Sequence, residues 1–236
     1  MRILLLSDIH ANSWALRAVR ADARAAEHTL CAGDVVNYGP DPTRVISWLR
    51  NHQAVTVRGN HDHAVAYSTD PKASPTKEPL ALAMRDWTRD QLEPADMAWL
   101  LARERKLLWE EGGVRFLIVH ATPVDPLYDY RLTPNASDSL VAELTRGVKA
   151  DVLLVGHTHL PLLRKYRNLT IVNPGSVGQP LDGDPRAAYA IWEDGEVTLR
   201  RVDYDRQAAV DALAKLPLNQ EIIGKLQTTL WQGAAE

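Results

Sequence analysis

The stretch that decides the fold is Val152-Leu153-Leu154-Val155-Gly156-His157-Thr158-His159. Its first four residues form a continuous apolar run, which is typical of a strand buried on both faces. Gly156 lets the backbone turn sharply where the strand ends, and two histidines one residue apart follow in that turn. Two imidazoles at a rigid strand end indicate a metal site, although two nearby histidines can also be ordinary loop residues.

The same pattern of an apolar run followed by a polar turn occurs three times near the N-terminus. Strands are predicted at residues 3–6, 29–32 and 55–57, and they end at Asp8 and His10, at Asp34, and at Asn60 and His61. A helix over 14–26 capped by Ser13, and another opened by Asp41-Pro42, are expected between them. Strands that alternate with helices in this way predict an α/β fold with a buried sheet.

The later part of the chain favours hairpins and a few more helices. Strands 107–109 and 114–119 flank a Gly-Gly turn and end at His120, and a helix capped by Ser137 or Asp138 runs to about residue 147. Antiparallel strands are expected at 162–165, 169–172, 187–192 and 197–202. We expect a helical excursion over about 80–103, a C-terminal helical segment over about 207–230 with a break near Pro217, and a single domain over 1–236.

Composition narrows the class of protein without identifying a partner. The chain of 236 residues has a net charge of −3, so no overall attraction to nucleic acid or to an anionic membrane is expected. Its single cysteine, Cys31, lies in an apolar run and is interpreted as core packing in a reducing compartment. The first apolar run is too short for a signal peptide or an anchor, so a cytoplasmic protein without membrane contact is expected. The oligomeric state is left open.

Five strand ends therefore bear side chains that bind metals. Any one of these histidines could be an ordinary loop residue, but the carboxyl ends of neighbouring strands converge on one crevice, where residues distant in sequence meet. The donor set has no thiolate, so it suits Mn, Fe, Co, Ni or Zn, with Mn as the first choice, and not a closed structural zinc site. The seven candidate ligands are Asp8, His10, Asp34, Asn60, His120, His157 and His159.

These motifs, in this order, resemble those of the calcineurin-like metallophosphoesterase superfamily. The resemblance covers residues 3 to about 202, and the compact N-terminal motif and Asn173-Pro174-Gly175-Ser176 are most similar to the small prokaryotic phosphodiesterase branch. It implies a four-layer α/β/β/α sandwich with two divalent metal ions at one edge. It also implies that Asp8, His10, Asp34 and His159 hold one ion, that Asp34, Asn60, His120 and His157 hold the other, and that Asp34 bridges them.

The resemblance also implies a mechanism and a role for His61. A hydroxide that bridges the two ions would attack the phosphorus, and the ions would clamp the phosphoryl oxygens. His61 would protonate the departing alkoxide with Asp62 as its orienting partner, although Asp62 could equally be an exposed loop residue. Where many members have His-Gly, this chain has His120-Ala121, so the pocket wall near that ion is expected to differ.

The expected activity is a binuclear metal-dependent phosphodiesterase that hydrolyses a small phosphate ester or a nucleotide. Two alternatives within enzymes are a phosphomonoesterase or phosphoprotein phosphatase, and a nucleotide pyrophosphatase. A non-catalytic binding scaffold is the alternative of another class, but the chain keeps every expected ligand and His61, which such scaffolds lose. Four residues near the strand ends are candidate substrate contacts, with turn and packing roles as the alternative: Asn12, Asn37, Tyr38 and Tyr128.

Overall fold

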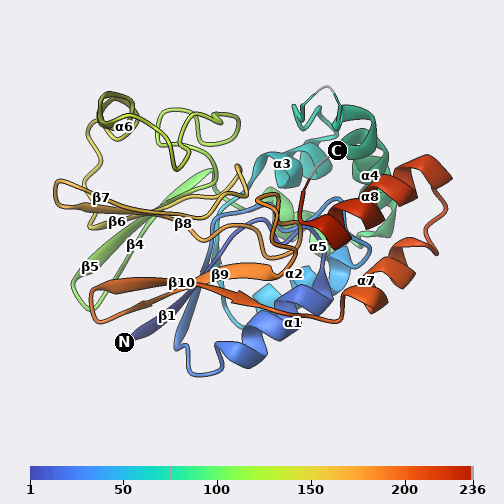
Figure 1. Ribbon diagram of the computed structural model, residues 1–236, viewed down its shortest axis with the longest axis horizontal. Helices are drawn as coiled ribbons and strands as arrows, with labels where there is room; N and C mark the ends of the chain where they lie inside the picture. Colours follow the sequence, from blue (N-terminus) through green and yellow to red (C-terminus); the bar gives the residue numbers. More distant parts are fainter. Residues whose placement is uncertain (75, 235–236) are drawn as a thin grey trace.

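A computed structural model describes residues 1–74 and 76–234, and two five-stranded sheets form its centre (Figure 1). The first sheet is built around three parallel strands near the N-terminus, and a hairpin from the later part of the chain extends it antiparallel. Its strands, in spatial order, are β10 (Glu196–Val202), β9 (Ala187–Glu193), β1 (Arg2–Leu6), β2 (His28–Cys31) and β3 (Val55–Thr56).

The second sheet combines the predicted hairpins with a parallel centre. Its strands, in spatial order, are β4 (Lys106–Glu111), β5 (Val114–Val119), β6 (Val152–Leu154), β8 (Leu169–Asn173) and β7 (Leu162–Tyr166). The hairpins β4–β5, β7–β8 and β9–β10 are antiparallel, as expected. However, β8 pairs with β6 in parallel, so the prediction of a wholly antiparallel later half is wrong.

The side chains of β1 show how the layers form. Ile3 and Leu5 point into the core between the two sheets, where they join Phe116 and other residues of the second sheet. Leu4 and Leu6 point to the opposite face, which the helices α1 (Ser13–Asp22) and α2 (Pro42–Asn51) cover. The helix α6 (Asp138–Leu144) packs on the outer face of the second sheet. These layers confirm the predicted α/β/β/α sandwich.

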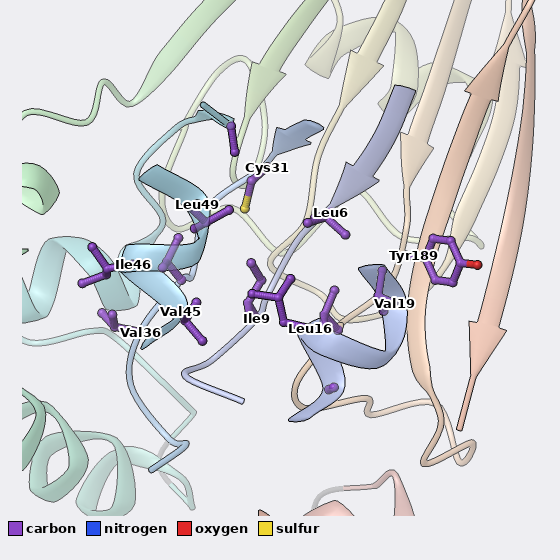
Figure 2. Packing of buried hydrophobic residues seen from close by; sticks show 14 of the residues in the cluster. Leu6, Ile9, Leu16, Val19, Cys31, Val36, Val45, Ile46, Leu49 and Tyr189 are labelled. Atoms are coloured by element: carbon purple, nitrogen blue, oxygen red, sulfur yellow. The ribbon is translucent and has the colours of Figure 1, made fainter. Parts of the chain in front are cut away.

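The core on the helical side of the first sheet contains the single cysteine. Figure 2 shows Cys31 and Leu6 from the strands packed against Leu16 of α1 and Leu49 of α2. The thiol of Cys31 is fully buried, and burial raises its pKa, so it stays protonated. The interpretation of Cys31 as a core residue is confirmed.

Two helices differ from their predicted form. The side chain of Asn12, not Ser13, caps α1 by accepting a hydrogen bond from Ala15 N. The helix ends at Asp22 and not at Ala26, because the chain turns back so that Glu27 N bonds to Arg2 O (2.8 Å) and β2 can start. The helix α3 (Asn60–Tyr67) was not predicted, because its first turn consists of polar residues typical of a loop.

The predicted helical excursion consists of α4 (Glu78–Gln91) and α5 (Pro94–Leu101), and the predicted C-terminal segment consists of α7 (Arg206–Leu213) and α8 (Gln220–Gln232). The helices α4, α7 and α8 share an apolar cluster that includes Tyr38, so they pack beside the strand ends (Figure 1). Trp99 of α5 is partly buried and packs against the core. No helix in the described ranges is both long and apolar enough to cross a membrane.

Candidate metal centre

Backbone hydrogen bonds join the polar turns at the strand ends. Asp8 N bonds to Gly33 O (3.0 Å) and His10 N to Asp34 O (2.9 Å), which ties the turn after β1 to the turn after β2. Gly156 N bonds to His120 O (2.7 Å), which ties the turn after β6 to the end of β5. The structure thereby brings all seven candidate ligands into one buried cluster.

The backbone at this cluster is unusual, since five of the candidate ligands adopt left-handed conformations. The φ angles of Asp8, His10, Asp34, His157 and His159 are 52°, 46°, 52°, 68° and 58°. Such conformations cost residues other than glycine roughly 1 to 3 kcal/mol each and concentrate at functional sites. The surrounding hydrogen bonds hold these turns open so that the side chains can converge.

Two glycines are required by close approach. A Cβ atom at Gly59 would lie 2.1 Å from Asp34 Oδ1, and a Cβ atom at Gly156 would lie 1.7 Å from Ser7 Oγ and 2.7 Å from Asp8 Oδ2. Any larger residue would push one of the two buried carboxylates out of the cluster. The φ angle of Gly156 is not positive, so glycine is required there for space: a side chain would collide with Ser7 and Asp8.

The first group of candidate ligands consists of Asp8, His10 and His159, which could together hold a metal ion. The Nε2 atoms of the two histidines lie 3.2 Å apart, and His159 Nε2 lies 3.4 Å from Asp8 Oδ1. The Nδ1 atom of each ring bonds to a backbone carbonyl, of Val36 (3.3 Å) and of Gln179 (2.5 Å). This second bond is how proteins orient metal-binding imidazoles.

The geometry of the first group fits a cation. Burial lowers the pKa of His10 to about 3 and that of His159 well below its usual range, so both rings are neutral at pH 7. Because each Nδ1 donates its proton to a carbonyl, both Nε2 atoms present lone pairs. Two lone pairs 3.2 Å apart repel each other, and a metal ion between them would turn that repulsion into coordination.

The second group consists of Asn60, His120 and His157. His120 Nε2 lies 2.9 Å from Asn60 Oδ1 and 3.1 Å from His157 Nδ1, and the latter lies 3.0 Å from Asn60 Oδ1. His120 Nδ1 donates to Ala32 O (2.8 Å), so its Nε2 faces the other two atoms. Oxygen and nitrogen donors again converge on one point, which suits a divalent transition-metal ion.

Asp34 lies between the two groups. Its Oδ1 accepts a hydrogen bond from His61 N (2.9 Å), while its Oδ2 lies 3.7 Å from His10 Nε2 and 3.3 Å from His120 Nε2. Asp8, Asp34 and His120 also form a group that could hold an ion. The position of Asp34 is thus compatible with the bridging role that the family resemblance implies.

The titration of the two carboxylates and His120 reflects their crowding. Burial raises the pKa of Asp8 to about 7, helped by the negative charge of Asp34. Burial opposes ionisation of Asp34 too, but His120 and His61 hold its pKa well below the usual range. Burial would lower the pKa of His120, yet Asp34 and Asp8 raise it to about 9. Without a metal ion, a proton on His120 therefore offsets the buried negative charge.

The partner of His61 is Asn37, and the prediction that Asp62 orients this ring is wrong. Asp62 Oδ1 accepts hydrogen bonds from the amides of Val35 (2.8 Å) and Val36 (3.1 Å), and its Oδ2 accepts one from Gly59 N (3.0 Å). Asp62 therefore shapes the turn after β2 and stabilises the start of α3. Its position three residues after Gly59 was the sequence signal for this helix start.

Asn37 fixes the tautomer of His61. Its Nδ2 lies 2.8 Å from His61 Nδ1 and also donates to Ala81 O (3.2 Å), while its Oδ1 accepts from Tyr38 N (2.9 Å). These bonds set the orientation of the amide, so His61 Nδ1 accepts a hydrogen bond and its proton lies on Nε2. Burial lowers the pKa of His61 to about 4. The ring is neutral at pH 7.

A cavity of about 310 Å³ adjoins the cluster and includes Asp34, His61, His157 and His159 in its lining. A hollow of about 710 Å³ near α6 is larger, but no candidate ligand lines it. Among the other residues that line the smaller cavity, Tyr38 was predicted from the sequence as a substrate contact. The remaining lining residues were not predicted: Lys72, Ala73, Ser74, Lys77, Tyr130, Thr158, Gln179 and Leu181.

The four candidate substrate contacts divide between the cavity and its surroundings. Tyr38 lines the cavity, and its ring lies against His10 and His61. Asn37 lies behind His61, and Asn12 has the alternative structural role as the cap of α1. Tyr128 does not line this cavity; Tyr130 does, with its ring tilted by 33° against that of His157 at a centroid distance of 3.7 Å. The sequence 128–130, Tyr-Asp-Tyr, offered no way to choose between the two tyrosines.

Comparison with known proteins places the site in a family. Residues 1–194 match the calcineurin-like phosphoesterase superfamily domain. An uncharacterized protein of Methanocaldococcus jannaschii is 30% identical over 235 residues, which cover 90% of this chain and 92% of that protein. The phosphodiesterase YfcE of Escherichia coli K12 is 26% identical over 206 residues, with 82% and 88% covered. A metallophosphoesterase from Sphaerobacter thermophilus is 31% identical, with a TM-score of 0.82 over 99% of this chain and 100% of that one.

Proposed function

The chain belongs to the calcineurin-like phosphoesterase superfamily, and on that basis we propose that it is a two-metal phosphodiesterase for small phosphate esters or nucleotides. The strongest support is that two groups of metal donors lie on either side of Asp34. Several residues of these groups line one cavity. A volume of about 310 Å³ suits a small ester. The name of YfcE, a relative at 26% identity, favours a diester.

The residues of this chain divide into two metal-binding sets in the proposed enzyme. Asp8, His10 and His159 would hold one ion; Asn60, His120 and His157 would hold the other; Asp34 would contact both. Divalent ions bound there would supply activated water and would neutralise charge on the phosphoryl oxygens. Manganese is our first choice, because the donors mix oxygen and nitrogen atoms without sulfur.

His61 would act on the leaving group. Its proton lies on Nε2, because Asn37 occupies Nδ1. The ring is buried beside the cavity, so a phosphate anion bound there would raise its pKa and favour proton donation to the departing oxygen. Tyr38, whose ring contacts His61, would limit the directions from which the ester can enter.

A substrate panel tests this proposal. Purified protein loaded with manganese should hydrolyse bis(p-nitrophenyl) phosphate, and a chelator should abolish the activity. The variant Asp34→Asn, which lacks the charge shared by both groups, should lose activity with the same substrate. Inertness of the metal-loaded protein toward diesters and monoesters alike would favour a binding scaffold, and a preference for monoesters or pyrophosphates would favour the other enzyme classes.

We also propose that the enzyme works in the cytoplasm without a stable nucleic-acid complex. The free, buried Cys31 fits a reducing compartment. A net charge of −3 gives no overall attraction to a phosphate backbone. Cell fractionation and a binding assay with labelled DNA and RNA at low salt would test these two points.

A further inference from the structure

The wall of the cavity contains positive charge that the metal centre does not use. Lys72 and Lys77 both line the cavity, and Asp34 is the one carboxylate among its described lining residues. Neither lysine belongs to the two donor groups, because an ammonium group has no lone pair for a metal ion. The two lysines need another explanation.

Lys77 is held in place by its backbone at the start of α4. Its N bonds to Ser74 O (2.8 Å) and its O accepts from Ala81 N (2.8 Å). Burial lowers the pKa of its ammonium group to about 8, and no described carboxylate offsets that burial. The group therefore stays largely charged at pH 7 without a counter-ion. A desolvated cation of this kind gains free energy when an anion binds beside it.

The side chain of Lys77 lines the same cavity as His61 and His159, so its charge faces the space beside the candidate metal centre. An anion that contacts Lys77 would consequently lie next to a phosphate bound at the metal centre.

The segment before Lys77 is also anchored to the site. Asn60 Nδ2 donates to Pro71 O (2.7 Å), and Arg85 Nη1 donates to Thr69 O (2.9 Å). The Nζ of Lys72 lies 4.3 Å from the centre of the Tyr128 ring, a favourable cation–π contact. Tyr128 thus positions a lysine at the cavity instead of lining it. These contacts fix the backbone of the segment and the ammonium group of Lys72, which reduces the entropy lost on binding.

Charge balance indicates what this wall binds. Two divalent ions, the carboxylates of Asp8 and Asp34 and one bound hydroxide would together carry a net charge of +1, which the single negative charge of a phosphodiester balances. The lysines add positive charge beyond this balance, so the cavity is complementary to a substrate with more than one negative charge. We propose that Lys77 is a specificity residue that binds a second anionic group, phosphoryl or carboxylate, on the substrate. This inference rests on the proposed function.

Competitive inhibitors with and without a second charge test this inference. The inhibitors are phosphonoacetate, 3-phosphonopropionate and 4-phosphonobutyrate, each compared with the analogue in which a neutral carboxamide replaces the carboxylate. Inhibition of bis(p-nitrophenyl) phosphate hydrolysis would be measured at a fixed concentration of free manganese. With the wild-type enzyme, at least one acid should inhibit roughly tenfold more strongly than its amide, as a partly buried charged hydrogen bond predicts. Lys77→Gln should remove this preference, and Lys77→Arg should keep it.

Lys165→Gln is the matched control, because it removes the same charge from an exposed position on β7 outside the cavity lining, and it should keep the preference. Equal inhibition by every acid and its amide would overturn the inference. The inference would also be overturned if Lys77→Gln weakened inhibition by the acid and by its amide equally, since Lys77 would then bind the phosphonate group itself. If the enzyme hydrolyses no ester, the proposed function fails, and calorimetric binding of the same pairs to manganese-loaded protein decides the inference separately.

Discussion

Asn60 shows how one side chain can serve the metal centre and the cavity wall together. Its Nδ2 donates to Pro71 O, which leaves Oδ1 directed at His120 and His157. An aspartate has no amide hydrogen, so it would place a carboxylate oxygen against the carbonyl of Pro71. The amide is therefore the side chain that orients a donor toward the metal centre and fixes the segment containing Lys72.

Replacement of Asn60 by aspartate tests this double role. Asn60→Asp should reduce the free energy of unfolding by roughly 1 to 3 kcal/mol, the cost of leaving buried acceptors unpaired. It should also speed cleavage by trypsin after Lys72, because the segment loses its anchor at Pro71. Urea denaturation and timed digestion would measure the two effects. Digestion at the wild-type rate would contradict the anchoring role.

Replacement of His61 separates proton donation from metal binding. His61→Ala should keep both metal ions, because its ring belongs to neither donor group. Turnover should fall by roughly 10²- to 10⁴-fold for an alkyl ester with a poor leaving group, and far less for a nitrophenyl ester, as for a lost general acid. Steady-state kinetics and elemental analysis would show this. Loss of metal from the variant would mean that His61 is a ligand.

At the scale of elements, the most consequential contact is that of Gly59, at the start of α3, with Asp34. Its φ of −86° is open to any residue, so the requirement for glycine is purely spatial. Gly59→Ala should lower the free energy of unfolding by about 2 to 4 kcal/mol and weaken metal binding, because the new methyl group collides with a buried carboxylate. Thermal denaturation and metal titration would measure both effects.

Gly224, inside α8, provides the matched control, because a Cβ atom there meets nothing within 4 Å. Gly224→Ala should stabilise the protein by roughly 0.5 to 1 kcal/mol through the better helix propensity of alanine. If both alanine variants had the same effect, the spatial argument for Gly59 would be lost.

The sequence predicted the elements whose pattern is local and missed those that depend on distant contacts. Buried strands such as β1 and β6 are apolar runs, and the hairpin turns are marked by their glycines, so both were found. The helix α3 was missed because its first turn consists of polar residues that the site requires. The early end of α1 was missed because it depends on a backbone hydrogen bond from Glu27 to Arg2, the first residue of β1, which is distant in the sequence.

At the scale of the whole molecule, the sequence allowed the layers to be predicted but not the order of the strands. The strand β9 lies beside β1 although more than 180 residues separate them, and its register depends on tertiary packing. The seven candidate ligands could be chosen from the sequence because each follows an apolar run. The cavity wall was missed because Lys72 and Lys77 belong to an irregular polar segment whose side chains look solvated in the sequence.

Removal of metal should affect the stability of the whole molecule, because the candidate centre joins the ends of both sheets. Asp8 and Asp34 are buried together, and His10 and His159 present lone pairs to each other, so the centre is electrostatically strained without cations. Manganese at about a thousand times its dissociation constant should add roughly 4 kcal/mol to the free energy of unfolding, which corresponds to a rise of about 10 °C in the melting temperature. Scanning calorimetry with manganese and with a chelator would measure the shift. Asp34→Asn should show a much smaller shift, and an equal shift in this variant would mean that manganese stabilises the protein at some other place.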